Sequence, residues 1–174
     1  SFNVYAKDST KNKIVPSQSR ITAYWPDGSV KWTAHTADSK NGETFEVIPV
    51  NEDVSSKKDM ESSLFVKEEE DAYIVDAGCV HATVPKNKNV ILCDVTVDGR
   101  VQVTDADLVL QLEERSVKDG ILIQKTVPYT GEIESVSIEE QGPVRVTFCL
   151  RGTHVSHAND RRVLPFVIRE TIYL

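Results

Sequence analysis

Apolar and polar residues alternate with a period of two along much of the chain, which is the pattern of strands with one buried face. The clearest example spans residues 144–151, where every second residue from Val144 to Leu150 is apolar. The residues between them, from Arg145 to Arg151, are charged, polar or small, so we expect the opposite face to hold charge. Residues 132–140 predict a further strand, and Gly142-Pro143 marks a bulge or a strand entry between the two.

The final residues follow the same pattern, so Leu174 lies inside a predicted strand. Natural ends usually fray into polar residues, and we therefore expect the chain to be a piece of a longer protein. At the other end, Ser1 is neither an initiator methionine nor part of a signal sequence, which leaves a mature, trimmed or truncated start open. The alternating apolar residues are Leu164, Phe166, Ile168, Ile172 and Leu174.

Turn residues between alternating segments predict hairpins. Pro26-Asp27-Gly28 separates residues 21–25 from residues 30–34 and suits a type I turn followed by a glycine bulge. Asp98-Gly99 separates two further strand patterns and suits a two-residue turn in which both residues have positive φ.

A third hairpin is predicted to pair residues 108–115 with residues 120–127. Residues 104–115 also fit a short helix, because Leu108, Val109 and Leu112 would share one helical face. We prefer the strand.

A polar, Ser-rich segment at residues 51–63 predicts a linker. It divides the chain into an N-terminal β segment, residues 1–50, and a longer β segment, residues 64–174. A segment of about 50 residues is marginal as an independent domain, so we expect the first to lean on the second. The acidic run at residues 68–71 is expected to be a solvated turn.

Composition supports a β fold, because Val, Ile and Thr total 48 of the 174 residues and Ala and Leu only 18. A net charge of −7 argues against nucleic acid, which needs a surplus of Lys and Arg. No apolar run approaches the roughly 20 residues of a membrane helix. The cysteines Cys79, Cys93 and Cys149 have no metal-site spacing and are interpreted as small buried residues, although one disulfide of unassigned pairing stays open.

Motifs of chemistry are sparse: phosphate-loop, dinucleotide and nucleophile-elbow patterns are absent. His154, His157 and Asp160 could begin a metal site, but the HxxH pattern lacks the glutamate of HExxH. We favour ordinary hydrogen bonding in a loop over residues 153–162. His35 and His81 are interpreted as solvated or core-edge residues, and neither a metal nor a cofactor is expected.

Two tryptophans and three arginines are the remaining candidates. Trp25 and Trp32 flank one turn and could form a sugar-stacking platform, but both continue an apolar stripe, so core packing is favoured. Guanidinium groups bind carboxylates in a bidentate manner, so an arginine could grip an acidic ligand, but salt bridges to the abundant glutamates are favoured. The candidate arginines are Arg145, Arg151 and Arg169.

The segment at residues 16–32, which ends in WPDGSVKW, resembles the WPDGSVKW signature of the exo-rhamnogalacturonan lyase-like family. Two weaker stretches fit the same family in order and spacing: EEQGPVR at 139–145 with RGTH at 151–154, and LPFVIR at 164–169. The resemblance therefore covers nearly the whole chain. It implies antiparallel strands that form a partial RIFT-type barrel at residues 1–50, followed by the first part of a β-sandwich at 64–174. The rest of the sandwich and an α/α toroid would be missing.

Enzymes of this kind cleave acidic polysaccharides by β-elimination, in which a base removes a proton activated by charge neutralisation. No catalytic residue of the family can be placed on this chain. The resemblance thus implies a non-catalytic scaffold within a secreted or periplasmic protein that acts on rhamnogalacturonan or a related glycan, with the missing domains and acidic polysaccharide as partners. A carbohydrate-binding module or a structural cell-surface domain is the alternative, with Trp25, Trp32, Arg145 and His154 as candidate substrate-binding residues.

Overall fold

Regular structure in the described part of the chain consists of antiparallel β-strands, as predicted. The computed structural model describes residues 2–7, 12–38, 44–49, 64–86, 89–156 and 158–174. Among these residues no helix is long and apolar enough to cross a membrane. The predicted linker at 51–63 and His157 lie outside the described residues.

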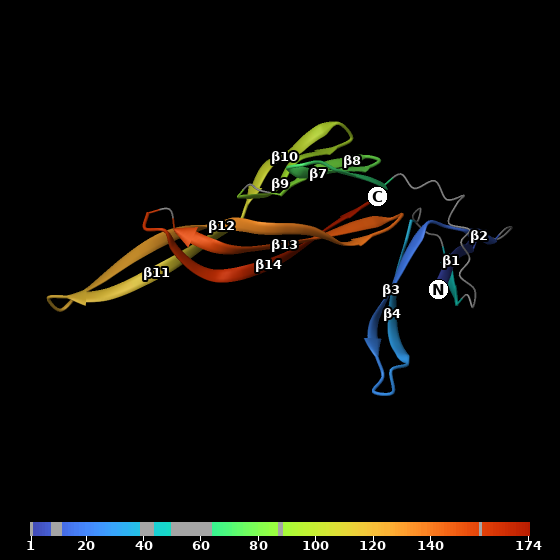
Figure 1. Ribbon diagram of the computed structural model, residues 1–174, viewed down its shortest axis with the longest axis horizontal. Helices are drawn as coiled ribbons and strands as arrows, with labels where there is room; N and C mark the ends of the chain where they lie inside the picture. The colour runs from blue at the N-terminus through green and yellow to red at the C-terminus, as the bar shows by residue number, and fades with distance from the viewer. Residues whose placement is uncertain (1, 8–11, 39–43, 50–63, 87–88, 157) are drawn as a thin grey trace.

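The N-terminal region contains two small antiparallel sheets (Figure 1). One has the order β2-β1-β5, and the other is the β3–β4 hairpin. The strands are β1 (Phe2–Lys7), β2 (Asn12–Ile14), β3 (Ser17–Tyr24), β4 (Val30–Ala37) and β5 (Thr44–Pro49).

Two larger sheets follow, with the orders β10-β9-β8-β7-β6 and β11-β12-β13-β14. The first contains β6 (Leu64–Glu68), β7 (Ala72–Ala77), β8 (Val80–Pro85), β9 (Val90–Val97) and β10 (Arg100–Asp107). The second contains β11 (Val109–Lys118), β12 (Ile121–Gln141), β13 (Arg145–Ser156) and β14 (Arg161–Tyr173). β12 and β14 are long enough to extend well beyond the area where the two sheets face each other (Figure 1).

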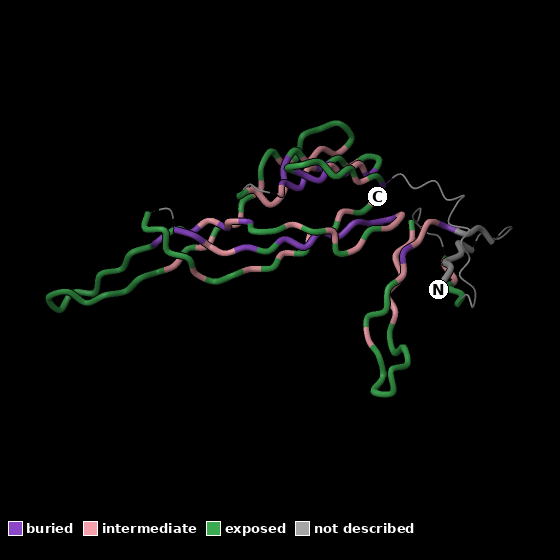
Figure 2. The backbone as a smooth tube through the Cα atoms, in the orientation of Figure 1, coloured by how far each residue is buried: buried purple, intermediate pink, exposed green. Residues whose placement is uncertain are grey.

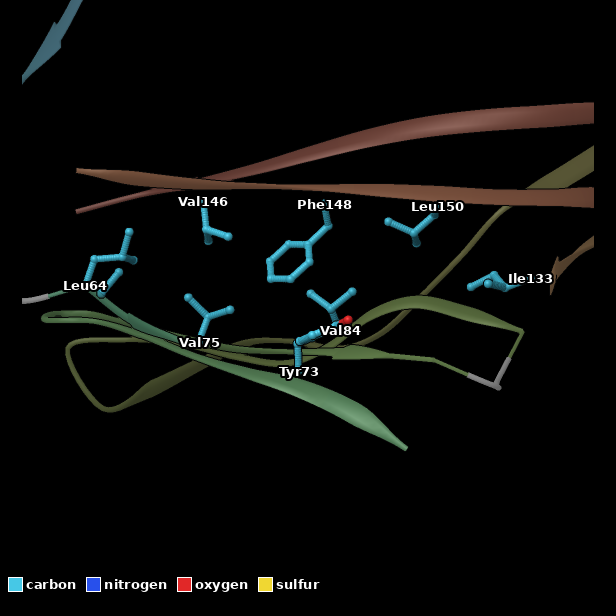
Figure 3. Close-up of a cluster of buried hydrophobic side chains, with 9 residues drawn as sticks. Leu64, Tyr73, Val75, Val84, Ile133, Val146, Phe148 and Leu150 are labelled. Atoms are coloured by element: carbon cyan, nitrogen blue, oxygen red, sulfur yellow. The ribbon is translucent and has the colours of Figure 1, made fainter. Parts of the chain in front are cut away.

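The main hydrophobic core lies between these two sheets, which makes the pair a β-sandwich (Figure 3). The rings of Tyr73 and Phe148 meet at its centre with centroids 5.3 Å apart. Around them pack aliphatic side chains from both sheets: Leu64, Val75, Ala77 and Val84 from one, and Ile133, Val146 and Leu150 from the other.

Strand β13 is buried on both faces, which differs from the sequence expectation in one respect. Its apolar residues face the core as predicted, but Arg145, Thr147 and Cys149 on the opposite face are buried as well. β13 is a central strand, and the charged side chains of β12 and β14 cover that face. Burial of both faces therefore follows from its neighbours in the sheet (Figure 2).

A bulge in β12 corrects the predicted alternation of residues 132–140. The register to β13 shifts between Ile133 and Ser135, so that Ile133, Val136 and Ile138 all pack on the core. Strict alternation would have placed Ile133 on the other face, and the extra residue of a bulge reverses that parity.

The first two predicted turns are confirmed. Gly28 has a φ of +84° and donates its N–H to the carbonyl of Trp25 at 2.9 Å, as a type I turn with a glycine bulge requires. Asp98 and Gly99 both have positive φ. The third hairpin is present, but its turn is Asp119-Gly120 and not residues 116–119, because residues 116–118 pair with residues 121–123. The helical alternative for residues 104–115 is wrong, because these residues form parts of β10 and β11.

The expectation that Trp25 and Trp32, with the apolar stripe of the β3–β4 hairpin, pack into a core is wrong. Trp25 is 50% exposed and Trp32 63% exposed, and Ile21 and Val30 are also exposed. The hairpin projects away from the sandwich, and no described layer covers its outer part (Figure 2). Alternation predicts which side chains share a face, but it does not show whether another layer covers that face.

Two smaller expectations are also corrected. Cys79 is exposed because it lies in the β7–β8 turn, whereas Cys93 and Cys149 are buried as predicted. Residues 153–156 belong to β13 and residues 161–162 to β14, so the segment interpreted as a loop is largely paired strand.

Candidate functional site

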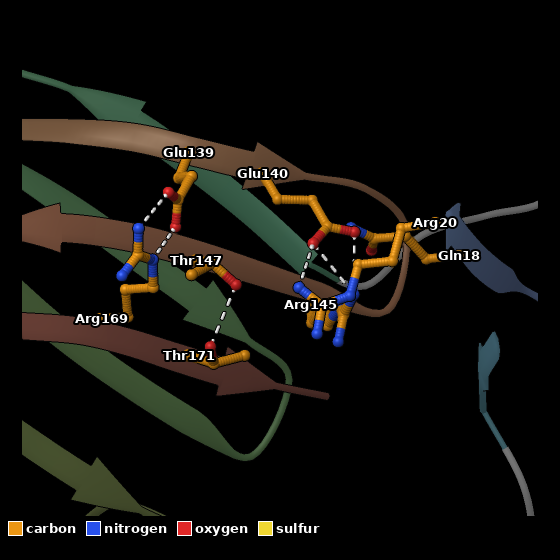
Figure 4. A network of polar contacts seen from close by, with 8 residues as sticks. All are labelled: Gln18, Arg20, Glu139, Glu140, Arg145, Thr147, Arg169 and Thr171. Atoms are coloured by element: carbon orange, nitrogen blue, oxygen red, sulfur yellow. Dashed lines mark hydrogen bonds and ion pairs between the residues drawn. The ribbon is translucent and has the colours of Figure 1, made fainter. Parts of the chain in front are cut away.

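Residues from each of the three segments that resemble the family lie together at one end of the four-stranded sheet (Figure 4). Gln18 and Arg20 come from β3, and Arg169 comes from β14. The remaining residues come from the end of β12, from β13 and from β14. We call the set the junction cluster: Gln18, Arg20, Glu139, Glu140, Arg145, Thr147, Arg169 and Thr171.

The connection between β12 and β13 holds the centre of the cluster in place. The N–H of Gly142 donates to the carbonyl of Arg145 at 3.1 Å, which closes the turn between the two strands. Gln18 packs so tightly on Gly142 that a Cβ at residue 142 would overlap its side chain. A glycine here lets the β3 strand approach the sandwich sheet closely.

Glu140 is the residue through which the hairpin and the sandwich interact. Arg145 Nη2 donates to both carboxylate oxygens of Glu140 at 2.9 Å, and Gln18 Nε2 donates to Oε1 at 2.7 Å. Arg20 Nη1 lies 3.9 Å from Oε2. Gln18 and Glu140 are 122 residues apart in sequence, so this carboxylate links two distant parts of the chain.

The central ion pair is stabilised in its charged form. Burial by itself would raise the pKa of Glu140, but hydrogen bonds from Arg145 and Gln18 and the nearby positive charges hold it below its ordinary value. Burial would likewise lower the pKa of Arg145, yet hydrogen bonds to Glu140 and Tyr173 raise it. Arg145 is only 6% exposed, so its charge depends on this pairing.

A second ion pair lies beside the first. Arg169 donates through Nε and Nη2 to the two oxygens of Glu139, at 2.6 and 2.9 Å. The hydrogen bond from Arg169 lowers the pKa of Glu139. This pair is more exposed than the first, so we expect it to contribute less to stability.

The two pairs border a hollow of about 410 Å³. Thr147 and Thr171 are among its lining residues, and their hydroxyls lie 3.0 Å apart (Figure 4). Arg20 from the hairpin and Tyr173 from β14 complete its lining. The hollow thus lies where the hairpin meets the sandwich sheet.

This arrangement is poorly suited to acid–base catalysis. A general acid or base works best with a pKa near the operating pH, whereas both glutamates have lowered pKa values and accept hydrogen bonds from arginine. Within the described residues, no group of three or more histidine, cysteine or acidic side chains is placed to hold a metal ion.

Trp25 directly follows β3 and Trp32 is the third residue of β4, so both lie at the turn end of the hairpin, whereas Gln18 lies at the other end of β3. Lys31 Nζ lies 4.2 Å from the centroid of the Trp25 ring, a cation–π contact that covers one face of the indole. Because Trp25 and Trp32 are exposed, the stacking of a sugar on their rings stays a prediction.

His154 lies at the opposite end of β13 from Arg145. The two are nine positions apart in sequence, which corresponds to roughly 30 Å of extended strand, so they cannot bind one small ligand together. His154 Nδ1 is 2.7 Å from the carbonyl of Leu164, a bulge residue with a φ of +46°. The ring also packs edge-on against Phe166, which gives His154 a structural role in the bulge.

The four predicted binding residues therefore lie at three separate places. Arg145 forms a salt bridge with Glu140, and Arg169 forms one with Glu139, which confirms the salt-bridge interpretation for both arginines. The sequence reasoning did not single out Gln18, Arg20, Glu139 or Glu140. Their signal was present, because each lies in or beside a segment that resembles the family.

Comparison with known proteins agrees with this geometry. Residues 3–51 match the PcRGLX-like N-terminal RIFT barrel domain, and residues 64–174 match the PcRGLX-like central β-sandwich domain. The chain is also 32% identical over 159 residues to the uncharacterized protein YetA of Bacillus subtilis (strain 168). That match covers 90% of this chain and 18% of YetA. The chain therefore belongs to the PcRGLX-like family, of which it carries the RIFT-barrel and central β-sandwich domains.

Proposed function

We propose that this chain is a non-catalytic β scaffold within a larger protein that acts on rhamnogalacturonan or a related acidic glycan, outside the cell or in the periplasm. Its partners are the further domains of that protein and, through them, the acidic glycan. The match to only 18% of YetA supports the view that chemistry resides elsewhere in such a protein.

The junction cluster is the observation that carries this proposal. Its two ion pairs lie within the four-stranded sheet, and Gln18 and Arg20 of the hairpin reach that sheet through Glu140. Arg145 is almost fully buried, and separation from Glu140 would leave its charge unpaired. The Arg145–Glu140 pair therefore holds one geometry. Such a junction supports a fixed orientation of neighbouring domains better than it supports proton transfer.

An activity assay tests the scaffold role. The 174-residue chain is incubated with rhamnogalacturonan oligosaccharides, and products are followed by the ultraviolet absorbance of unsaturated uronates and by chromatography. We expect no product above that of the glycan alone. Product that accumulates in proportion to the chain concentration would contradict a non-catalytic role.

A second candidate function is glycan binding by the β3–β4 hairpin. It is favoured by the exposure of Trp25 and Trp32, because indole faces stack well on apolar faces of sugar rings. The chain contains only these two tryptophans, so its indole fluorescence reports on this hairpin alone.

Fluorescence titration with the same oligosaccharides tests this candidate. Binding by the hairpin predicts a saturable change in emission, with affinity reduced about tenfold or more in Trp32→Ala. Phe65→Ala is the matched control, because Phe65 is an exposed aromatic residue on β6 of the sandwich. Emission that does not respond, or an equal loss in both variants, would exclude the hairpin as the binding surface.

A further inference from the structure

The hollow beside the junction cluster carries more hydrogen-bond donors than acceptors. Three guanidinium groups and two carboxylates line it, so the lining has a surplus of one positive charge in a chain whose net charge is −7. Glu140 already accepts hydrogen bonds from Arg145, and Glu139 accepts them from Arg169. The acceptors are therefore engaged by the protein itself.

Arg20 supplies the surplus charge. Its nearest carboxylate oxygen, Oε2 of Glu140, is 3.9 Å away, too far for a hydrogen bond. That oxygen already accepts from Arg145 at 2.9 Å. The Arg20 side chain is 56% exposed, so its planar guanidinium is open to an anion that enters from solvent.

Three hydroxyl groups add further donors. Thr147 and Thr171 share one hydrogen bond at 3.0 Å, which uses one of their two protons and leaves the other to donate. Tyr173 also lines the hollow, and its phenolic O–H can donate a hydrogen bond. A ligand that suits this lining must offer acceptors, and an anionic oxygen suits it best.

We propose that this hollow binds a small carboxylate that also carries hydroxyl groups, such as a sugar acid, with the carboxylate paired to Arg20. The hydroxyls of Thr147, Thr171 and Tyr173 would hydrogen-bond the remaining ligand oxygens. A volume of about 410 Å³ accommodates one sugar ring and lies in the range of small-molecule sites. The site needs neither the tryptophans nor catalysis, so it stands apart from both functions proposed above.

Titration of the isotope-labelled chain with D-glucuronate, D-glucose and acetate, followed by NMR, tests this site. We expect weak, saturable binding of glucuronate with amide shifts centred on Arg20, Arg169 and Thr171, and no saturable binding of glucose. Acetate should bind more weakly than glucuronate. High salt should weaken glucuronate binding, because the pairing with Arg20 is partly exposed.

Variants decide which side chains form the site. Arg20→Gln should weaken glucuronate binding about tenfold, since it removes a charge-assisted hydrogen bond. Tyr173→Phe should weaken it by a smaller factor while it keeps the ring. Arg100→Gln is the matched control for charge, because Arg100 is exposed beside the β9–β10 turn. This variant should bind glucuronate with unchanged affinity.

Several results would overturn the proposal. These are equal binding of glucose and glucuronate, acetate as good a ligand as glucuronate, unchanged affinity in Arg20→Gln, shifts centred on Trp25 and Trp32, or no binding at all. Should Arg20→Gln fail to fold, Tyr173→Phe and the salt dependence of the unmodified chain decide the question.

Discussion

At the scale of single residues, Glu140 and Glu170 show two opposite outcomes of burying a carboxylate. Glu140 receives hydrogen bonds from Arg145 and Gln18, which outweigh the cost of burial and keep it ionised. Glu170 lies between Ile168 and Ile172 on the core-facing side of β14, and its Oε2 has no partner among the described residues. Burial raises the pKa of Glu170 to about 7.

The position of Glu170 has a physical explanation at the sheet edge. β14 is an edge strand of the four-stranded sheet, and it pairs Glu170 with Phe148 of β13. Inward-pointing charges on edge strands are one device by which proteins avoid pairing edge to edge with another copy. The cost of that charge in the core depends on pH.

Glu170→Gln should therefore stabilise the chain in a pH-dependent way. A folded-state pKa of about 7, above the ordinary value of 4.5, means that the folded state keeps its proton longer than the unfolded state. The contribution of Glu170 to the free energy of unfolding is therefore most favourable below pH 4.5. It becomes less favourable as the pH rises towards 7, and it stays constant above pH 7. The variant should gain about 1–2 kcal/mol at pH 8, less than the full pKa difference implies because solvent screens the partly exposed carboxylate, and almost nothing at pH 4.5.

Urea denaturation of both chains at several pH values measures this difference. Glu70→Gln is the control, because Glu70 is exposed in the turn between β6 and β7, and its effect should be small at every pH. A gain for Glu170→Gln that is equal at pH 4.5 and pH 8 would show that the charge of Glu170 is not its cause.

At the scale of elements, bulges and close approaches shape the long strands of the four-stranded sheet. A bulge near Glu134 keeps the apolar residues of β12 on the core, and another at Leu164 is closed by His154. Gly152 lies opposite Ile133 of β12 and Phe166 of β14. A Cβ at Gly152 would overlap the carbonyl oxygen of Glu132 and the ring of Phe166.

Gly152→Ala should destabilise the chain by about 2 kcal/mol or more, because a backbone atom cannot move aside as a flexible side chain can. Chemical denaturation followed by circular dichroism measures the loss. Ser135→Ala on the neighbouring strand is the control and should change stability by less than about 0.5 kcal/mol, since Ser135 is exposed. Equal stability of Gly152→Ala and the unmodified chain would mean that β12 and β13 can separate at this point without cost.

At the scale of the whole molecule, stability is concentrated in the sandwich. Its core contains the fully buried Val75, Val84, Phe148 and Leu150, whereas the outer parts of the β3–β4 and β11–β12 hairpins are exposed (Figure 2). A two-stranded ribbon is at best marginally stable alone, so both hairpins depend on the sheets at their base.

Phe148→Ala should lower the free energy of unfolding by about 3–5 kcal/mol, because it leaves a cavity between the two sheets opposite Tyr73. Phe65→Ala removes the same ring from a position that is 64% exposed and should change stability by less than about 0.5 kcal/mol. Thermal unfolding monitored by circular dichroism compares the two. Similar losses in both variants would contradict a core centred on Phe148.

Much of the fold could be predicted from the sequence because its signals are local. Alternation of side chains along a strand and turn residues such as Asp98-Gly99 act over a few residues, and both are confirmed in β9, β10 and β13. The resemblance in WPDGSVKW pointed to the family that the two domain matches show. The junction cluster was not predicted, because its contacts join Gln18 to Glu140 across 122 residues.

The sequence by itself determined the strands, two of the three turns and, apart from the bulge in β12, the side chains that share a face. Tertiary structure alone decided which of those faces is covered. Trp25 and Val146 both lie in apolar alternating patterns, yet Trp25 is half exposed and Val146 is fully buried. The physical reason is that burial depends on a second layer, and that layer is built from residues distant in the chain. The same reason applies to Glu140, whose hydrogen bond from Gln18 follows from the approach of β3 to the sandwich sheet.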